Sequence, residues 1–288
     1  NTHSPYTGVI TKIDVATDFN GYKKPAFFID VEKDEWCEEI DTSEDIVREI
    51  KLSSKEIIER IKDRGIVGLG GAAFPTHVKY MVPEDKKAEY LIINAAECEP
   101  YLTSDNRVIL EHTEEVLIGI EIMKKALNIN KAKIGIEANK PKAIEALRKM
   151  LNQYPGTEVV PLKTKYPQGA EKQLIYALTK REVPSGKLPI EVACVVNNVG
   201  TAFAIYQAVQ KNRPLIDNIL TFTGKKTTNN KNLLVRVGTS IQSIIDFCGG
   251  LPEDTGKVIN GGPMMGKAMM DLSAPTTKTT SSILVMSE

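Results

Sequence analysis

The sequence is poor in the residues that metal sites and disulfide frameworks use. Its 288 residues include three histidines and four cysteines, at Cys37, Cys98, Cys194 and Cys248. No two cysteines have C-x-x-C spacing, so the chain contains neither a zinc-ribbon motif nor a local iron–sulfur ligand set. Scattered cysteines in a chain of this length are typical of reduced, intracellular proteins. We therefore expect no metal-ligating residues here.

Excess charge, aromatic residues and long apolar runs are also missing. Lys+Arg and Asp+Glu number 37 each, and aromatic residues make up 6%. This balance argues against a nucleic-acid binder, which usually carries a basic excess. The longest apolar runs, such as VLIGIEIM at 116–123, are much shorter than the ~20 residues of a membrane-spanning helix. The chain begins NTHSPYTG, with no signal peptide and no initiating Met, so we expect a truncated start.

What is present indicates an ordinary globular protein of two or three domains, with 42% hydrophobic residues. Residues 3–32 alternate as short β-strands and resemble part of a small β module. From Asp41 the apolar spacing becomes helical. Ser53 or Ser54 is a plausible N-cap and Gly65 fits the C′ position. The apolar positions of this helical pattern are Ile46, Val47, Ile50, Ile57, Ile58 and Ile61.

Strand-like and helix-like segments alternate through residues 90–212, which predicts a mostly parallel sheet covered by helices. One long helical period runs from about Ser104 to Leu127. After Pro214 the segments shorten and gain β character, which predicts a small α+β module. The Thr/Ser-rich tail from Ser273 is typical of a linker.

A glycine-rich stretch, GIVGLGGAAFPTHVK, spans residues 65–79. Glycine permits positive φ and close approach of another group, and free N–H groups in such a loop suit a phosphate. Phe74 and Lys79 add a flat apolar face and a cation. Taken alone, the stretch fits a tight packing turn equally well.

Three further polar motifs follow predicted strands or precede a helix, where ligands of open α/β sheets bind. They are NAAECEP at 94–100, YPQGAE at 166–171 and VNNV at 196–199. Helix capping or a simple turn explains each motif taken singly.

Taken together and in this order, GLGGAAFPTHVK, NAAECEP, YPQGAEKQ and VVNNVGTA resemble the flavin- and NADH-binding subunit family of respiratory complex I, in the branch of the C subunit of the Rnf electron-transport complex. The resemblance implies an α/β fold with a Rossmann-like, mostly parallel sheet core. It implies a partial β barrel-sandwich hybrid segment at 1–40 and an FMN/NADH-binding α/β domain at 41–213. A β-grasp (SLBB) α+β domain at 214–272 and a linker at 273–288, leading to a missing 4Fe-4S ferredoxin-like domain, complete the implied organisation.

The resemblance also assigns cofactor-binding roles by position, and it assigns no catalytic residue. The loop that holds the FMN phosphate and the cofactor's edge is matched by Gly68, Gly70, Gly71 and Lys79. The surroundings of the flavin and nicotinamide are matched by Asn94, Glu97 and Glu99. The segment lining the NADH pocket is matched by Tyr166, Gly169 and Glu171. The pair that contacts the FMN ribityl-phosphate is matched by Asn197 and Asn198, and an aromatic on the adenine side of NADH by Phe74.

The function implied is that of an oxidoreductase and translocase subunit. It exchanges hydride between NAD(H) and FMN, and electrons with two 4Fe-4S clusters that lie in the full-length protein outside this chain. The implied partners are the other Rnf subunits and, indirectly, ferredoxin, with the membrane reached only through partner subunits and no nucleic acid involved. The implied location is the cytoplasmic face of the cell membrane, as a peripheral protein.

Four positions depart from the complex I pattern. Leu69 stands in place of Arg, His77 in place of Gly, Ala96 in place of Asp, and Ala170 in place of Glu. Two alternatives stay open: a cobalamin reductase of the diol-utilisation type, which shares this architecture, and a scaffold subunit that has lost its cofactor. The two alanines favour the scaffold.

Overall fold

The computed structural model describes residues 2–288, which form two compact units. The first comprises residues 41–98 and 105–215. The second comprises residues 2–40, 99–104 and 216–288. Residues 99–104 thus belong to the second unit, although the chain on either side of them belongs to the first.

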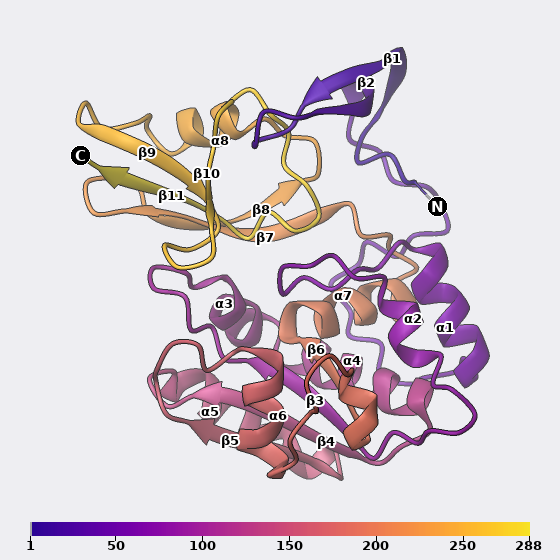
Figure 1. The fold of residues 1–288 in the computed structure, drawn as a ribbon. Helices are drawn as coiled ribbons and strands as arrows, with labels where there is room; N and C mark the ends of the chain where they lie inside the picture. Colours follow the sequence, from indigo (N-terminus) through magenta and orange to yellow (C-terminus); the bar gives the residue numbers. More distant parts are fainter. Residues whose placement is uncertain (1) are drawn as a thin grey trace. The chain divides into compact units, whose positions relative to one another are not determined.

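The first unit is built on a four-stranded parallel sheet with the strand order β5-β4-β3-β6 (Figure 1). Its strands are β3 (Tyr90–Ala95), β4 (Lys131–Glu137), β5 (Thr157–Leu162) and β6 (Cys194–Asn198). The prediction of a mostly parallel sheet is confirmed. In a parallel sheet the carboxyl ends of all strands lie along the same side of the sheet, which we call its carboxyl edge. The residues that follow these strands therefore share that edge.

Helices cover both faces of this sheet. α6 (Glu171–Thr179) packs on one face, where Leu174, Ile175 and Leu178 join Ile92 and Val196 in a buried cluster. The opposite face carries α4 (Thr113–Leu127) and α7 (Val199–Gln210), which pack on each other, and α5 (Pro141–Met150), which packs on α4. The short 3₁₀ turns Leu151–Gln153 and Pro189–Val192 lead into β5 and β6.

The helix before the glycine-rich stretch is α1 (Ser54–Asp63), and its ends agree with the sequence. Ser53 is the N-cap of a full capping box with Glu56. Gly65 takes φ 66° just after the C-cap Arg64, so the chain can turn sharply into the loop. α2 (Thr76–Tyr80) begins directly after that loop.

Two helical expectations are corrected by the structure. Residues 42–50 form no helix, although Ile46, Val47 and Ile50 have helical spacing. A side chain of α7 binds this backbone instead: Gln210 donates to the carbonyls of Val47 and Glu49. The long period over 104–127 is divided into α3 (Ser104–Glu111) and α4 at His112, whose φ of −130° and ψ of 39° interrupt the helix.

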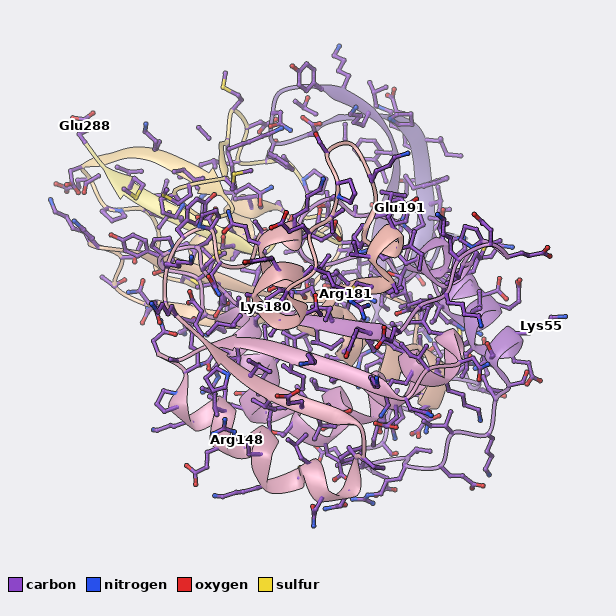
Figure 2. The ribbon with its side chains drawn as sticks, turned by 60° about the horizontal axis from the view of Figure 1, so that its bottom comes forward. Lys55, Arg148, Lys180, Arg181, Glu191 and Glu288 are labelled. Carbon is purple, nitrogen blue, oxygen red and sulfur yellow. The ribbon has the colours of Figure 1, made fainter. Side chains whose placement is uncertain are left out.

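The amino end of β3 is fixed by a cation. Arg181, labelled in Figure 2, pairs with Glu89 and lies 5.0 Å from the centre of the Tyr90 ring. Its guanidinium also donates to the carbonyl of Val192. These contacts join the start of β3 to the segments before β6, at the edge opposite to the strand ends.

The main part of the second unit is a five-stranded mixed sheet with the order β10-β9-β11-β7-β8. Its elements are β7 (Asp217–Gly224), β8 (Lys231–Arg236), α8 (Ile241–Phe247), β9 (Thr255–Asn260), β10 (Lys267–Ala268) and β11 (Ser282–Ser287). The expectation of a linker over 273–288 does not hold for β11, which is the middle strand of the sheet. A short apolar run, SILVM, gives β11 the buried side chains that a central strand needs.

Residues 2–40 contain a separate antiparallel hairpin of β1 (Thr7–Thr17) and β2 (Lys23–Lys33). Cross-strand partners share a face, and the pairs Ile10–Ile29 and Ile13–Phe27 make one face apolar. That face is uncovered: Ile13 is 72% and Phe27 54% exposed. A two-stranded sheet has little stability of its own. The prediction that this segment is part of a small β module stays a prediction.

Among the described residues, no helix is both long enough and apolar enough to cross a membrane.

The central place of β11 can be tested by truncating one of its side chains. Ile283 is fully buried in the core of the second unit, so Ile283→Ala is expected to lower the free energy of unfolding of that unit by about 2–4 kcal/mol. Urea unfolding of the whole chain measures this change. Thr277→Ala, at an exposed position of the same tail, is the control, and a linker would make both substitutions equally harmless.

Candidate functional site

The glycine-rich stretch forms a closed loop between α1 and α2. Val67 pairs with Pro75 in a β-bridge, and the N–H of Gly68 donates to the carbonyl of Phe74 at 2.9 Å. Gly70 and Gly71 at the tip are exposed. Gly71 has φ 127°, and nothing lies within 4 Å of where a Cβ would be. The loop therefore presents open backbone, in a conformation that requires glycine at its tip.

This loop lies against the first turn of α7. The N–H of Leu69 donates to the hydroxyl of Thr201 at 3.0 Å. A Cβ on Gly70 would lie 3.4 Å from the Cβ of Asn198. Asn198 is the N-cap of α7, and its side-chain oxygen accepts from the N–H of Gly200 at 2.8 Å. The exposed tip of the loop and the N-terminus of α7 thus lie side by side, and the positive end of a helix is favourable for an anion such as phosphate.

Lys79 supplies a cation next to these groups. Its Nζ donates to the carbonyl of Val196, near the end of β6, at 2.7 Å. Burial lowers the pKa of Lys79, while the nearby charge of Glu171 acts in the opposite direction. Lys79 and Glu171, which are far apart in the sequence, are therefore brought together at one edge of the sheet.

Asn94 and Gly169 join two of the predicted motifs. The amide of Asn94 donates to the carbonyl of Gly169 at 2.8 Å, and the N–H of Gly169 lies 3.3 Å from the sulfur of Cys98. A Cβ on Gly169 would lie only 2.6 Å from the carbonyl oxygen of Ala96. Only glycine fits this close approach, so segments 94–98 and 166–171 are locked side by side.

Glu97 belongs to a buried network of charged groups that the sequence analysis did not anticipate. Its carboxylate accepts from the N–H of Asp105 at 2.9 Å and lies 3.4 Å from the Nζ of Lys140. Asp105 accepts a hydrogen bond of 2.7 Å from the side-chain amide of Asn198. Burial raises the pKa of Glu97, and burial together with the Glu97 charge raises the pKa of Asp105 to about 7.

Glu137, at the end of β4, is a third carboxyl group near this network. It is 2% exposed and accepts from the N–H of Lys165. Burial raises its pKa, and Lys140 is the cation that opposes this shift. The ammonium of Lys140 is thus shared by three carboxyl groups. The network therefore holds at least one proton more readily than isolated carboxylates do.

Asn197 and Asn198 take different positions, because neighbouring strand residues face opposite sides of a sheet. The Asn197 side chain is buried, 2% exposed, and lies near the buried Tyr80 hydroxyl. Neither polar atom of Asn197 has a well-formed hydrogen bond, nor has the Tyr80 hydroxyl. The predicted contact of Asn197 with FMN stays a prediction.

Glu99 belongs to the second unit. Its carboxylate accepts from the N–H groups of Met264, at 3.0 Å, and Met265, at 2.7 Å. A Cβ on Gly262 would lie 2.2 Å from the same carboxylate, so this turn is shaped around Glu99. Its predicted place at the flavin and nicotinamide also stays a prediction.

The remaining predicted residues are accessible. Phe74 is 45% and Tyr166 38% exposed. Glu171 is the first residue of α6, where a carboxylate is favoured by the helix N-terminus. Across residues 2–288 no group of His, Cys, Asp or Glu side chains is arranged to hold a metal ion.

Sequence reasoning missed Asp105, Lys140, Glu137 and Thr201. Glu137 is the last residue of β4 and Lys140 comes shortly after it, much as Asn94 lies near the end of β3, so the strand-end rule could have found them. Asp105 gave no such signal, because it lies in the first turn of a helix.

These residues fit an FMN. The open loop at Gly71, the start of α7 and the cation of Lys79 suit its phosphate.

Comparison with known proteins agrees with this geometry. Residues 61–207 match the protein family described as the Nuo51 FMN-binding domain. The C subunit of the proton-translocating ferredoxin:NAD(+) oxidoreductase complex of Clostridium ljungdahlii is 53% identical over 254 residues, which are 88% of this chain and 54% of the relative. The Na(+)-translocating counterpart of Acetobacterium woodii is 46% identical, over 82% of this chain and 54% of the relative. The chain thus spans about half the length of these curated relatives.

Among solved structures, an NAD+-reducing [NiFe]-hydrogenase in the air-oxidized state is similar, with a TM-score of 0.69 at 20% identity. The similarity covers 81% of this chain and 46% of that one. It confirms the α/β fold class.

The buried carboxyl network predicts how stability depends on pH. The raised pKa of Asp105 means that the folded chain keeps its proton from about pH 4 to about pH 7 while the unfolded chain loses it. Across that window Asp105 lowers the free energy of unfolding by at most about 1.4 kcal/mol per pH unit, with no further loss above it. Asp105→Asn removes this loss, so its stability relative to the wild type is expected to rise between pH 4 and 7.

Urea unfolding at a series of pH values measures the difference. Glu111→Gln, an exposed carboxyl on the same helix, is the matched control and is expected to follow the wild type. A constant difference between Asp105→Asn and the wild type at all pH values would contradict the prediction.

Proposed function

Because the chain belongs to the family of the Nuo51 FMN-binding domain, we propose that it binds FMN and exchanges hydride between NAD(H) and this flavin. We further propose that it does so as part of an ion-translocating ferredoxin:NAD+ oxidoreductase, the kind of complex that its relatives are named for. These names favour this function over that of a cobalamin reductase.

The observation that carries the proposal is the contact between the open glycine loop and the start of α7. Gly71 exposes backbone that no side chain covers, and Leu69 and Gly70 hold the loop against Thr201 and Asn198. This is the place where the open backbone of the loop tip, the positive end of α7 and the ammonium of Lys79 can bind a phosphate together.

FMN, when bound, supplies the ability to take two electrons from a nicotinamide and pass them on singly. The chain's own residues bind and orient. Phe74 and Tyr166, both partly exposed, offer flat faces on which nucleotide rings can stack. Asn94 fixes segment 166–171 against the end of β3. Hydride exchange requires no side chain to act as acid or base, so we assign no catalytic residue.

The wider context is part of the proposal. Iron–sulfur clusters would receive the electrons from the flavin, ferredoxin would be the distant partner, and other subunits would link the protein to the cytoplasmic face of the membrane. The support for these points is that the relatives are named as subunits of ion-translocating oxidoreductase complexes.

A scaffold without cofactor is the competing candidate. Two observations favour it: Ala96 and Ala170 lack polar side chains, and the Glu97 carboxylate already has partners within the protein. FMN binding separates the two functions.

Titration of the chain with FMN is expected to quench flavin fluorescence saturably. Gly71→Ala is expected to weaken binding at least tenfold, because the new methyl group strains a residue with φ 127° and occupies the open space before the loop. Gly186→Ala is the matched control, since Gly186 also has positive φ and open space around it but lies in another loop.

Both variants are expected to fold, as far-UV circular dichroism can show. A folded wild type that gives no saturable quenching at high micromolar FMN would overturn the flavin proposal and favour the scaffold. Equal losses in the two glycine variants would mean that the loop is not the cradle.

Phe74 tests the nucleotide side separately. Phe74→Ala is expected to raise the dissociation constant for NADH about threefold to tenfold, the usual value of one aromatic stack, and to leave FMN binding unchanged. Titration of the FMN-loaded chain with NADH under anaerobic conditions measures this. Phe247→Ala, which removes another exposed phenylalanine, serves as control. An unchanged NADH affinity would remove Phe74 from the site.

A further inference from the structure

The orientation of Asn198 is fixed by two hydrogen bonds at opposite ends of its amide. Its Oδ1 accepts from the N–H of Gly200, which only an acceptor can do. Its NH₂ group must therefore face Asp105, whose Oδ2 accepts from it at 2.7 Å. Asp105 thus decides which way the N-cap of α7 points, although it lies on another helix.

Asp105 is itself surrounded by groups that can change its charge. Glu97 lies beside it from the segment after β3, and Lys140 faces Glu97 from the start of α5. Glu137, at the end of β4, shares the influence of Lys140. The other neighbours are uncharged: α7 contributes Asn198 and Gly200, and the glycine loop contributes Leu69, which approaches the same side of Gly200.

We propose that Asp105 is a positioning residue of the FMN site, which carries one proton for the Glu97–Asp105 pair and holds Asn198 in place at the start of α7. The inference rests on the proposed function, because it concerns the site assigned to the FMN phosphate. Neither residue of the pair touches reacting atoms in this assignment.

The proton matters because of where its loss puts negative charge. A Cβ on Gly200, in the first turn of α7, would lie 3.7 Å from Oδ1 of Asp105. A second carboxylate there competes with a phosphate for the positive end of the helix. When the pH rises through the value of about 7 at which Asp105 loses its proton, anion binding at this helix start weakens.

The test is FMN titration of the full chain at pH 6 and pH 8. The wild type is expected to bind FMN about tenfold more weakly at pH 8. Asp105→Asn, which keeps an acceptor for Asn198 but has no charge, is expected to bind as tightly as the wild type at pH 6 and to lack the tenfold loss at pH 8. Any effect of the ionisation of FMN itself would remain in this variant.

Asp105→Ala separates positioning from charge. This variant removes the acceptor for the Asn198 amide, so FMN binding is expected to weaken about tenfold at both pH values. Asp105→Asn, which keeps an acceptor, is expected to restore the binding. Glu111→Gln is the control on the same helix. A merely structural role for Asp105 would give Asn and Ala the same loss and would leave the pH profile unchanged.

A readout without flavin is the infrared band of a protonated carboxyl group. The wild type minus Asp105→Asn difference spectrum at pH 7 is expected to contain this band, and its absence overturns the proposal. So does an Asp105→Asn pH profile equal to that of the wild type. Absence of FMN binding in the wild type at either pH is a different result, which overturns the proposed function.

Discussion

The site depends on the central position of β3, which pairs in parallel with β4 on one side and β6 on the other. This pairing sends the ends of all three strands to one edge. Asn94, Glu137 and Asn198 therefore lie at the same edge, although more than forty residues separate each from the next along the chain. Arg181 fixes the opposite end of β3, so the strand cannot slide without breaking an ion pair with Glu89. The register of one strand thus decides which polar groups meet.

This edge of the sheet also holds several carboxyl groups in a region that is shielded from water. Glu97, Asp105 and Glu137 surround a single ammonium, that of Lys140. Such a group of carboxyls costs stability unless protons or partners balance it. An anion site at a helix start can tolerate it only while at least one carboxyl is neutral. In the proposed site, binding of a phosphate and retention of a proton are therefore linked.

Much of this was predictable from the sequence, for a physical reason. Apolar runs such as LII in β3 and alternating helices predict a parallel sheet, and strand ends predict a site. Long-range hydrogen bonds were not predictable. The helix predicted from the spacing of Ile46, Val47 and Ile50 was wrong, because Gln210 binds the backbone of that segment. β11 was missed because its Thr- and Ser-rich surroundings look like a linker. Asp105 was missed because its hydrogen bond with Asn198 joins two segments that are far apart in the sequence.

Segment 99–104 gives the two units an unusual relation along the chain. Glu99 is held by the turn at Gly262–Met265, and Thr103 bonds to Thr221 and Asn232, so both ends of this segment are fastened within the second unit. The boundary between the units is therefore not a single peptide linkage that a protease or a gene fusion could divide. Residues 41–215 cut out as one piece would carry six residues whose partners had been left behind. The two units are thus interleaved along the chain, and neither corresponds to one continuous stretch of sequence.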